Sequence, residues 1–508
     1  MELELKTTHL NCYDTLLDTT LFQEETLESI VPDACPDILR IVDTEALVCL
    51  KSKEAQEGRM EVAGTARCAI LYLPDSGQEL RRMTVSIPFT CAAEAAGLNR
   101  SCRLTAVPRV QSADARMLNP RKVLTRVSLA VDLQAFAPQT ASFCDGVECE
   151  SDAGIQQMGE TQSACLVAAV EEKPFTFSDD LSLSGSRPVA EELLKTRADL
   201  VCSESKIIGN KLIFKGEADL QLLYRATDGS LCPASFELPF SQIMEVSEVG
   251  EDADCALQVT LTGCECTLDG EEGRTLSLSL SLLAQAVVRE ERQVTLLSDI
   301  YSTAYQLTAE RKPYTFYRLM EHAQRRVTVR ELLETVSPVR EVCDVYVNVG
   351  AVAAVREGAQ VNLSAETAVT VVYLAEDGSL ETARRAIPAA CPVELPEGSA
   401  CTCRCVCPGE RFATPTGGGV EVRYPLDFRY LALMPHPATG VSDVRLDESA
   451  PRDTAGQPSI VLRLVGEGER LWDIAKAYGT TTEDIVQANA LGEEAPPAGQ
   501  LLLIPKKR

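Results

Sequence analysis

The chain has 508 residues, enough for about three to four domains, and its hydrophobic fraction of 45% is ordinary for a globular protein. Its 48 basic and 75 acidic residues give a net charge of −27, which argues against binding to nucleic acid or anionic lipid, because such binders usually present a basic patch. No apolar run of about 18 residues predicts a membrane span, and no secretory signal is visible. We therefore expect the 20 cysteines to stay reduced in the compartment where the chain is made.

One short pattern occurs three times. An apolar run ends at a tyrosine, a glycine follows five residues later, and an apolar-proline pair comes after that. The tyrosines are Tyr72, Tyr224 and Tyr373, which are 152 and then 149 residues apart. This spacing is too long for a solenoid unit, so the repeat predicts three copies of a whole domain.

The first copy is expected over residues 21–140, after a polar lead-in at residues 1–20. Apolar and polar residues alternate on both sides of Asp75-Ser76-Gly77, which predicts a β-hairpin with its turn at the glycine. A long alternating run over residues 123–136 predicts a last strand.

The second and third copies are expected over residues 170–292 and 310–435, where similar segments, Glu172–Phe177 and Arg311–Phe316, open each copy. A helix-like segment, the hairpin and a final alternating strand follow. The helix-like segments are residues 189–194 and 329–333, and the final strands are residues 276–282 and 420–430. The prediction is a mainly β protein with three sandwich-like repeat domains, each with a short helix.

Residues 436–458 are rich in Pro, Gly, Asp and Ser and lack periodicity, so they predict a linker. A compact module is expected over residues 459–506. Its pattern predicts a strand, a helix from Leu471 that Gly479 stops, a second helix capped by Thr481, and a closing strand, in the order β-α-α-β.

This module resembles a LysM domain. The residues that fit the family pattern are Val465, Gly468, Leu471, Ile474, Ala475, Tyr478, Gly479, Asn489, Gly499, Gln500, Leu502, Ile504 and Pro505. The resemblance implies binding to glycans that contain N-acetylglucosamine, such as peptidoglycan, in a groove between two loops. The implied binding residues are Gly468, Glu469, Arg470 and Leu471 on one side and Asn489, Ala490 and Leu491 on the other.

Two positions depart from the LysM pattern. Glu469-Arg470 replaces the usual Asp-Thr, which removes a helix cap that typically contributes about 1 kcal/mol, and Arg463 replaces an aromatic residue. Both changes suit a LysM domain that binds protein. The alternative is a fold that persists while its groove binds nothing strongly.

The three upstream copies resemble the SPOCS (spore-coat assembly) domain. The resemblance depends on the hairpins Gly64–Tyr72 and Gly216–Tyr224, the Asp-Gly turn and the Pro-Phe element. In the third copy Ser364 or Ala365 stands near the glycine position, and Ala389 replaces the phenylalanine.

SPOCS copies followed by one LysM domain are the layout of SipL-type coat morphogenetic proteins. The resemblance implies a non-enzymatic scaffold in the mother-cell cytoplasm, at the forespore surface, that connects the ATP-hydrolysing base-layer protein of the coat to other coat proteins. The repeats would serve self-association or partner docking. The alternative is a LysM-mediated binder of peptidoglycan in cell wall or cortex.

The sequence offers little for catalysis. The three histidines are scattered, and no serine-nucleophile, phosphate-loop or His-Glu metal motif stands out, so we expect no enzyme activity, cofactor or metal. A hydrolase that uses the acidic surface is a third hypothesis, without an identifiable acid or base. Trp472 is expected in packing or at a partner surface.

The alternating cysteines Cys401, Cys403, Cys405 and Cys407 are the most unusual local feature. On a strand they share one face about 6.5 Å apart, near the upper limit for a disulfide, and zinc sites prefer wider sequence spacing. We expect small core side chains, with oxidative cross-linking and metal binding as the alternatives.

Overall fold

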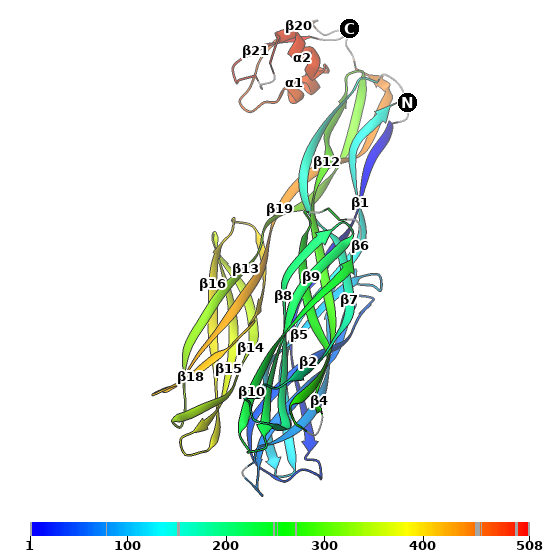
Figure 1. The fold of residues 1–508 in the computed structure, drawn as a ribbon. Helices are drawn as coiled ribbons and strands as arrows, with labels where there is room; N and C mark the ends of the chain where they lie inside the picture. Colours follow the sequence, from blue (N-terminus) through cyan, green and yellow to red (C-terminus); the bar gives the residue numbers. More distant parts are fainter. Residues whose placement is uncertain are drawn as a thin grey trace.

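The computed structural model describes residues 3–77, 79–149, 153–246, 249–250, 252–269, 272–452, 458, 460–492 and 496–505. The protein is mainly β, as expected, and its described helices are two short ones near the C-terminus. Figure 1 shows an elongated molecule with a broad body, a narrower stalk and a small terminal module at the tip of the stalk. None of the described helices is long and apolar enough to cross a membrane.

The first repeat consists of two packed sheets. Its strands are β1 (Leu3–Ile30), β2 (Ile38–Gln56), β3 (Arg59–Pro74), β4 (Arg81–Glu94), β5 (Arg103–Asn119) and β6 (Lys122–Cys149). One sheet has the order β2-β3-β4, the other contains β1-β6-β5, and a single apolar core lies between them. The predicted hairpin is β3 and β4, and the predicted last strand is part of β6.

The other two repeats have the same plan. The second consists of β7 (Ile155–Ser182), β8 (Ala190–Ile208), β9 (Lys211–Ala226), β10 (Leu231–Glu245), β11 (Asp254–Asp269) and β12 (Thr275–Ser302). The third consists of β13 (Tyr305–Glu334), β14 (Val339–Glu357), β15 (Gln360–Ala375), β16 (Leu380–Glu394), β17 (Ala400–Val406), β18 (Phe412–Thr416) and β19 (Gly419–Pro451). In each, a three-stranded sheet built on the hairpin packs on a sheet that contains the long first and last strands.

The expected lead-in and most of the expected linker are strand. The described part of residues 1–20 belongs to β1, which pairs with β6 along its length, and residues 436–451 continue β19 along β13. The linker residues 453–457 lie outside the described residues. Neither segment has the apolar periodicity that predicts a strand from sequence. Each is a strand because it pairs with a neighbouring strand.

The prediction of a short helix in each repeat is wrong, because both helix-like segments are strand. Residues 190–194 open β8 and residues 329–333 lie near the end of β13. In β8 both Leu193 and Leu194 are buried because the strand is covered on two sides, and this adjacent pair mimics a helical apolar face. The two segments are not equivalent, since one follows the long first strand and the other is part of it.

A glycine–phenylalanine pair explains part of the repeated motif. Gly64 lies opposite Phe89 across β3 and β4, and a Cβ atom on Gly64 would press on the Phe89 ring and lie 2.6 Å from the Cys49 carbonyl oxygen. Gly216 and Phe240 repeat the arrangement in the second copy. In the third copy the opposite residues are Ala365 and Ala389, so the loss of the ring accompanies the gain of a methyl group.

The outer ends of the long strands form the stalk. Its residues are 3–13, 138–149, 155–166, 290–302, 305–317 and 435–451. An apolar cluster with members from all six strands fills its interior: Cys144, Val147, Leu297, Ile300, Val441 and Val444, with Leu3, Leu5, Ile155, Leu307 and Ala309 against them. The stalk therefore joins the three repeats at one end.

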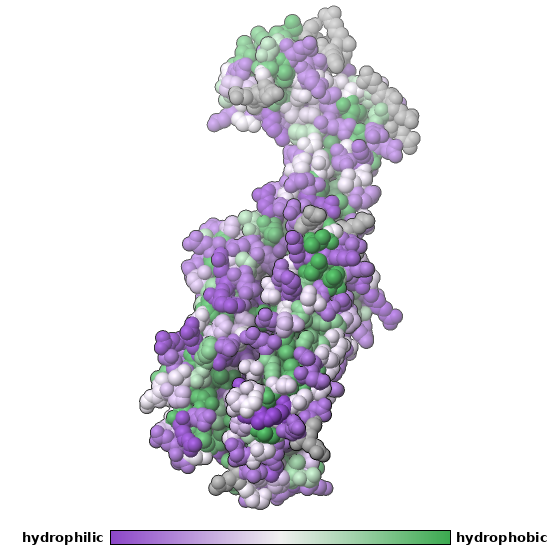
Figure 2. Space-filling view, in the orientation of Figure 1, coloured by the Kyte–Doolittle hydropathy of each residue, from purple (hydrophilic) through white to green (hydrophobic). Residues whose placement is uncertain are grey.

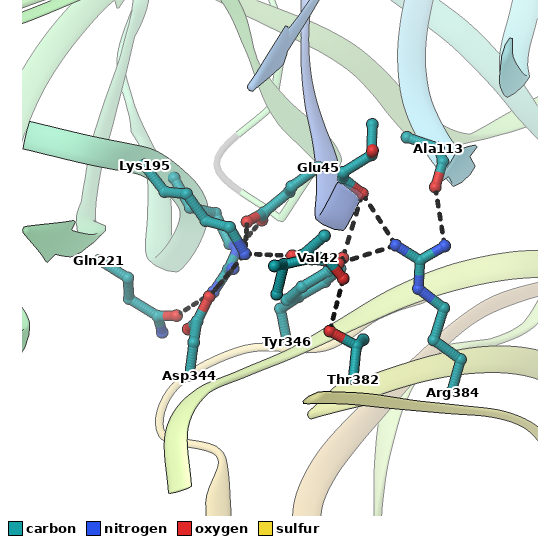
Figure 3. A network of polar contacts seen from close by, with 12 residues as sticks. Val42, Glu45, Ala113, Lys195, Gln221, Asp344, Tyr346, Thr382 and Arg384 are labelled. Carbon is teal, nitrogen blue, oxygen red and sulfur yellow. Dashed lines mark hydrogen bonds and ion pairs between the residues drawn. The ribbon is translucent and has the colours of Figure 1, made fainter. Parts of the chain in front are cut away.

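A buried charged network joins the repeats within the body (Figure 3). Lys195 of β8 pairs with Asp43 of β2 and, at 2.9 Å, with Asp344 of β14. These three residues occupy equivalent repeat positions, 152 and 149 residues apart. Arg384 also pairs with Asp43 at 2.7 Å, and the Tyr346 hydroxyl donates to Asp43 at 3.0 Å. We call these five residues the charged junction.

Ion pairs within the charged junction offset the cost of burying its charges. Lys195 is 3% exposed and Asp43 is fully buried. Burial alone would raise the pKa of Asp43, but Lys195 and Arg384 outweigh it and hold that pKa below its usual value. Burial alone would lower the pKa of Lys195, but Asp344 and Asp43 hold it well above its usual value. Both groups therefore stay charged, and each requires the others.

Lys195→Met tests this dependence. The substitution leaves Asp43 and Asp344 buried without their shared cation, and removing one partner of a buried pair typically costs about 3–5 kcal/mol. Urea unfolding of the variant should show a loss of that size. Lys215→Met is the control, because its pair with Glu204 is exposed and such pairs contribute about 0–1 kcal/mol. Equal losses in both variants would contradict the junction's role.

Gly64→Ala tests the glycine–phenylalanine pair. Overpacking against Phe89 should cost about 1–3 kcal/mol in the free energy of unfolding. Combining Gly64→Ala with Phe89→Ala copies the third repeat, so the double variant should lose less than the sum of the single losses. Gly185→Ala is the control, since a Cβ there meets no atom within 4 Å. Strict additivity in the cycle would argue against the compensation.

Candidate functional site

The terminal module has the expected order β-α-α-β. Its elements are β20 (Ile460–Leu464), α1 (Leu471–Tyr478), α2 (Thr482–Asn489) and β21 (Leu501–Pro505). Gly479 ends α1 in the left-handed conformation, with φ of 65°, and the Thr481 side chain accepts a hydrogen bond from the Asp484 backbone N–H at 3.0 Å to cap α2. Both predicted helix signals are confirmed.

A groove of about 840 Å³ lies between the two loops at one end of the module. Five of the seven residues expected to bind a ligand line it: Gly468, Glu469, Arg470, Leu471 and Leu491. Gly466, Val486, Gly492, Pro496 and Ala498 complete the described lining. Val486 was not expected in the groove because it also fits the apolar pattern that, with Ile485 and Ala488, predicts the second helix.

Asn489 and Ala490, the other two expected binding residues, do not line the groove. The Asn489 amide donates to the carbonyl oxygens of Ile485 and Leu503 and accepts from the Leu503 N–H at 2.7 Å, which ties α2 to β21. Ala490 ends α2 in the left-handed conformation, with φ of 45°. In this structure these two residues connect and end elements of the module.

The departures from the LysM pattern change the rim of the groove. Arg470 precedes α1 without a capping hydrogen bond and instead pairs with Asp473 in the first turn at 3.0 Å. Glu469 accepts from the Gly466 N–H at 3.0 Å and pairs with Arg463 at 2.5 Å. The backbone hydrogen bond and Arg463 lower the pKa of Glu469, so this residue of the groove lining carries a fixed negative charge.

The module is docked on the stalk. Trp472 of α1 packs its ring on Tyr301 of β12, with centroids 4.9 Å apart, and donates from Nε1 to Asp299 at 2.8 Å. Lys476 pairs with the same carboxylate at 2.6 Å, and the Tyr301 hydroxyl donates to the Thr480 carbonyl oxygen at 2.8 Å. The expectation of a packing role for Trp472 is thus met by an interface within the chain.

The outer face of the β20–β21 sheet is apolar and uncovered. Its exposed side chains are Ile460, Leu462, Leu464 and Leu501, each more than half exposed. They alternate along the paired strands, so all point away from the helices. Figure 2 shows hydrophobic residues gathered over this sheet at the end of the molecule. We call these four residues the apolar face.

The four alternating cysteines belong to the core of the third repeat. Cys405 and Cys407 are buried there, and Cys401 and Cys403 pack against the same cluster. All four are free thiols, and burial raises the pKa of Cys403 to about 12, which leaves very little reactive thiolate at neutral pH. These contacts favour the expected packing role.

The repeated tyrosines are also structural. Tyr72 and Tyr224 are buried, and their hydroxyls donate to the carbonyl oxygens of Pro36 at 3.4 Å and Pro188 at 3.1 Å. Each therefore closes its hairpin against the segment before the first strand of that sheet. Among the described residues, no group of three or more His, Cys, Asp and Glu side chains is placed to hold a metal ion.

Comparisons with known proteins identify two kinds of domain. Residues 37–118 and 190–269 match the SipL, SPOCS domain family, and residues 464–505 match the LysM domain family. The SPOCS matches span β2–β5 of the first repeat and β8–β11 of the second. The comparisons with curated proteins and with solved structures found no match. Both matched families are binding or scaffold domains, and SPOCS is a spore-coat domain. The chain therefore combines SPOCS domains with a C-terminal LysM domain, the arrangement of the SipL-type spore-coat proteins that its sequence resembles.

Proposed function

We propose that the protein is a non-enzymatic scaffold of the spore coat, made in the mother cell and placed at the forespore surface. The three repeats form a rigid body, and the LysM module at the tip of the stalk docks a coat protein, with the ATP-hydrolysing base-layer protein as the first candidate. Linking repeats and module in one chain raises the effective concentration of every bound partner.

The observation that carries this proposal is the apolar face. Exposed aliphatic side chains on one small sheet suit a protein interface, because partner burial removes them from water. Glycans, by contrast, are polar. The charged side chains Glu469 and Arg470 line the groove that would take a glycan, and Arg463, which pairs with Glu469, replaces the aromatic residue of the family pattern.

Deletion of residues 459–508 should abolish capture of the coat partner in a pulldown. Leu462→Asp and Leu464→Asp should weaken that capture at least tenfold, because they place charge in an apolar interface without disturbing the module core. Ile243→Asp, on β10 of the body, is the matched control because Ile243 is also half exposed. Partner capture that survives the deletion would contradict the proposal.

The second candidate function is peptidoglycan binding through the groove, which the LysM match favours. Co-sedimentation with purified peptidoglycan separates the two. The scaffold proposal predicts that the protein stays in solution. Sedimentation that Leu471→Asp abolishes and Leu462→Asp preserves would establish the glycan function instead.

The stalk fixes the direction in which the module faces. Burial alone would raise the pKa of Asp299, but hydrogen bonds from Lys476 and Trp472 outweigh it and hold the pKa below its usual value. A lowered folded-state pKa stabilises the docked module above the ordinary value of about 3.9, and this stabilisation is lost as the pH falls through the folded pKa.

Emission from Trp472, the single tryptophan of the chain, reports this contact. Its fluorescence should stay constant from pH 7 to about 5 and change below about 4 as Asp299 takes up a proton. Asp299→Asn should alter the emission at pH 7 and remove the acid step. Asp443→Asn, on the exposed part of β19, is the control, and its Trp472 fluorescence should change with pH as that of the wild type does. Identical curves for Asp299→Asn and the wild type would contradict a charge-held dock.

A further inference from the structure

A cavity of about 280 Å³ lies where the three repeats meet, apart from the LysM groove and the charged junction. The first repeat contributes Asp18 and Gln134. The second contributes residues 202–205, residues 255–258 and Arg289. The third contributes residues 322–324, Thr402, Arg404 and residues 429–431. The site exists only when all three repeats are assembled.

Arg289 of β12 lines this cavity without a carboxylate in direct contact, and Asp254 and Asp18 act on its charge only from farther away. Its residue is 7% exposed, and it forms no hydrogen bond or ion pair with any residue that the structure describes. Burial lowers its pKa, yet an arginine stays protonated in proteins. Other buried cations differ: Lys195 and Arg225 each pair with carboxylates. A buried charge without a direct partner is costly, so an anionic ligand that pairs with Arg289 would offset this cost.

The cavity offers a second donor of the same kind. Arg429 of β19 donates from Nε to the Gln324 side chain at 3.1 Å and has no carboxylate within ion-pair distance among the described residues. The third arginine, Arg404, is already engaged by Asp18 at 2.8 Å and by Asp132 at 3.3 Å. Two guanidinium groups therefore remain available to a ligand.

The charges and walls of the cavity limit the ligand. Asp18 and Glu204 also line the cavity, Asp254 pairs with the lining His322, and Asp132 pairs with Arg404. These nearby carboxylates favour a singly charged ligand over a doubly charged phosphate at the two available guanidinium groups. Apolar wall comes from Ala256, Leu257, Ala323, Tyr430 and Leu431. A guanidinium group matches a carboxylate with two parallel hydrogen bonds.

We propose that this cavity binds a small monocarboxylate with an apolar body, with Arg289 as the anchor and Arg429 as the second donor. The ligand contacts all three repeats and thereby stabilises their assembly, since a ligand that binds only the assembled form shifts the folding equilibrium toward it.

Calorimetric titration of the full chain with benzoate, and with hexanoate as an aliphatic probe, tests the proposal. The wild type should bind at least one carboxylate and should not bind the neutral isostere benzamide or hexanamide. Arg289→Met should raise the dissociation constant at least tenfold, because it removes the charge-assisted pair. Arg292→Met is the control, as Arg292 is about half exposed and pairs with Glu290 at 2.9 Å.

Thermal unfolding separates a ligand anchor from a structural residue. Arg289→Met should melt at the same temperature as the wild type or higher, because it removes an unpaired buried charge, and should lose the upward shift that the carboxylate gives. Three results would overturn the proposal: no binding of either carboxylate by the wild type, equal binding by Arg289→Met, or a clearly lower melting temperature of Arg289→Met without ligand.

Discussion

The charged junction is the constraint on which the arrangement of the repeats depends. Three equivalent positions of three like domains meet in a site that water does not reach, so identical charged residues there would repel one another. The chain resolves this by divergence, with Asp43, Lys195 and Asp344 at the three positions. Buried ion pairs add little net stability compared with apolar packing, so we interpret the junction as a device that specifies which repeat stands beside which.

The junction and the stalk together make one body out of three repeats. An apolar cluster of equivalent strands, which includes Leu71, Leu223 and Val372, packs beside the junction, and the long strands bury a second apolar column in the stalk. Most of the interior is thereby committed to packing. The sites that we propose for binding are places where the packing is incomplete: the uncovered sheet of the LysM module, its groove and the cavity with Arg289.

Much of the fold could be predicted from the sequence because it is local. The period-two alternation of the hairpins, the turn at Gly77 and the cap at Thr481 are each encoded within a few residues. The long outer strands could not be predicted in this way. Residues 436–451 contain Pro, Gly and Asp and have the composition of a linker, and only their pairing with β13 makes them a strand.

The candidate sites also differ in whether a local sequence pattern predicts them. The groove could be predicted from a family pattern, although Asn489 proved to be a structural tie. The junction and the cavity could not, since their residues are far apart in the sequence. A signal for the junction did exist: Asp43, Lys195 and Asp344 have the same spacing as the repeated tyrosines. Comparing charged residues at equivalent repeat positions would have found it.

Hydrogen exchange of the full chain, followed by mass spectrometry at increasing urea concentrations, tests the central claim most directly. It measures the free energy at which each strand of the body opens. The account predicts one shared opening energy for β2, β8 and β14, because none of the three can leave the junction without exposing buried charges of the other two. Three distinct energies, with each repeat opening alone while the other two stay protected, would contradict it.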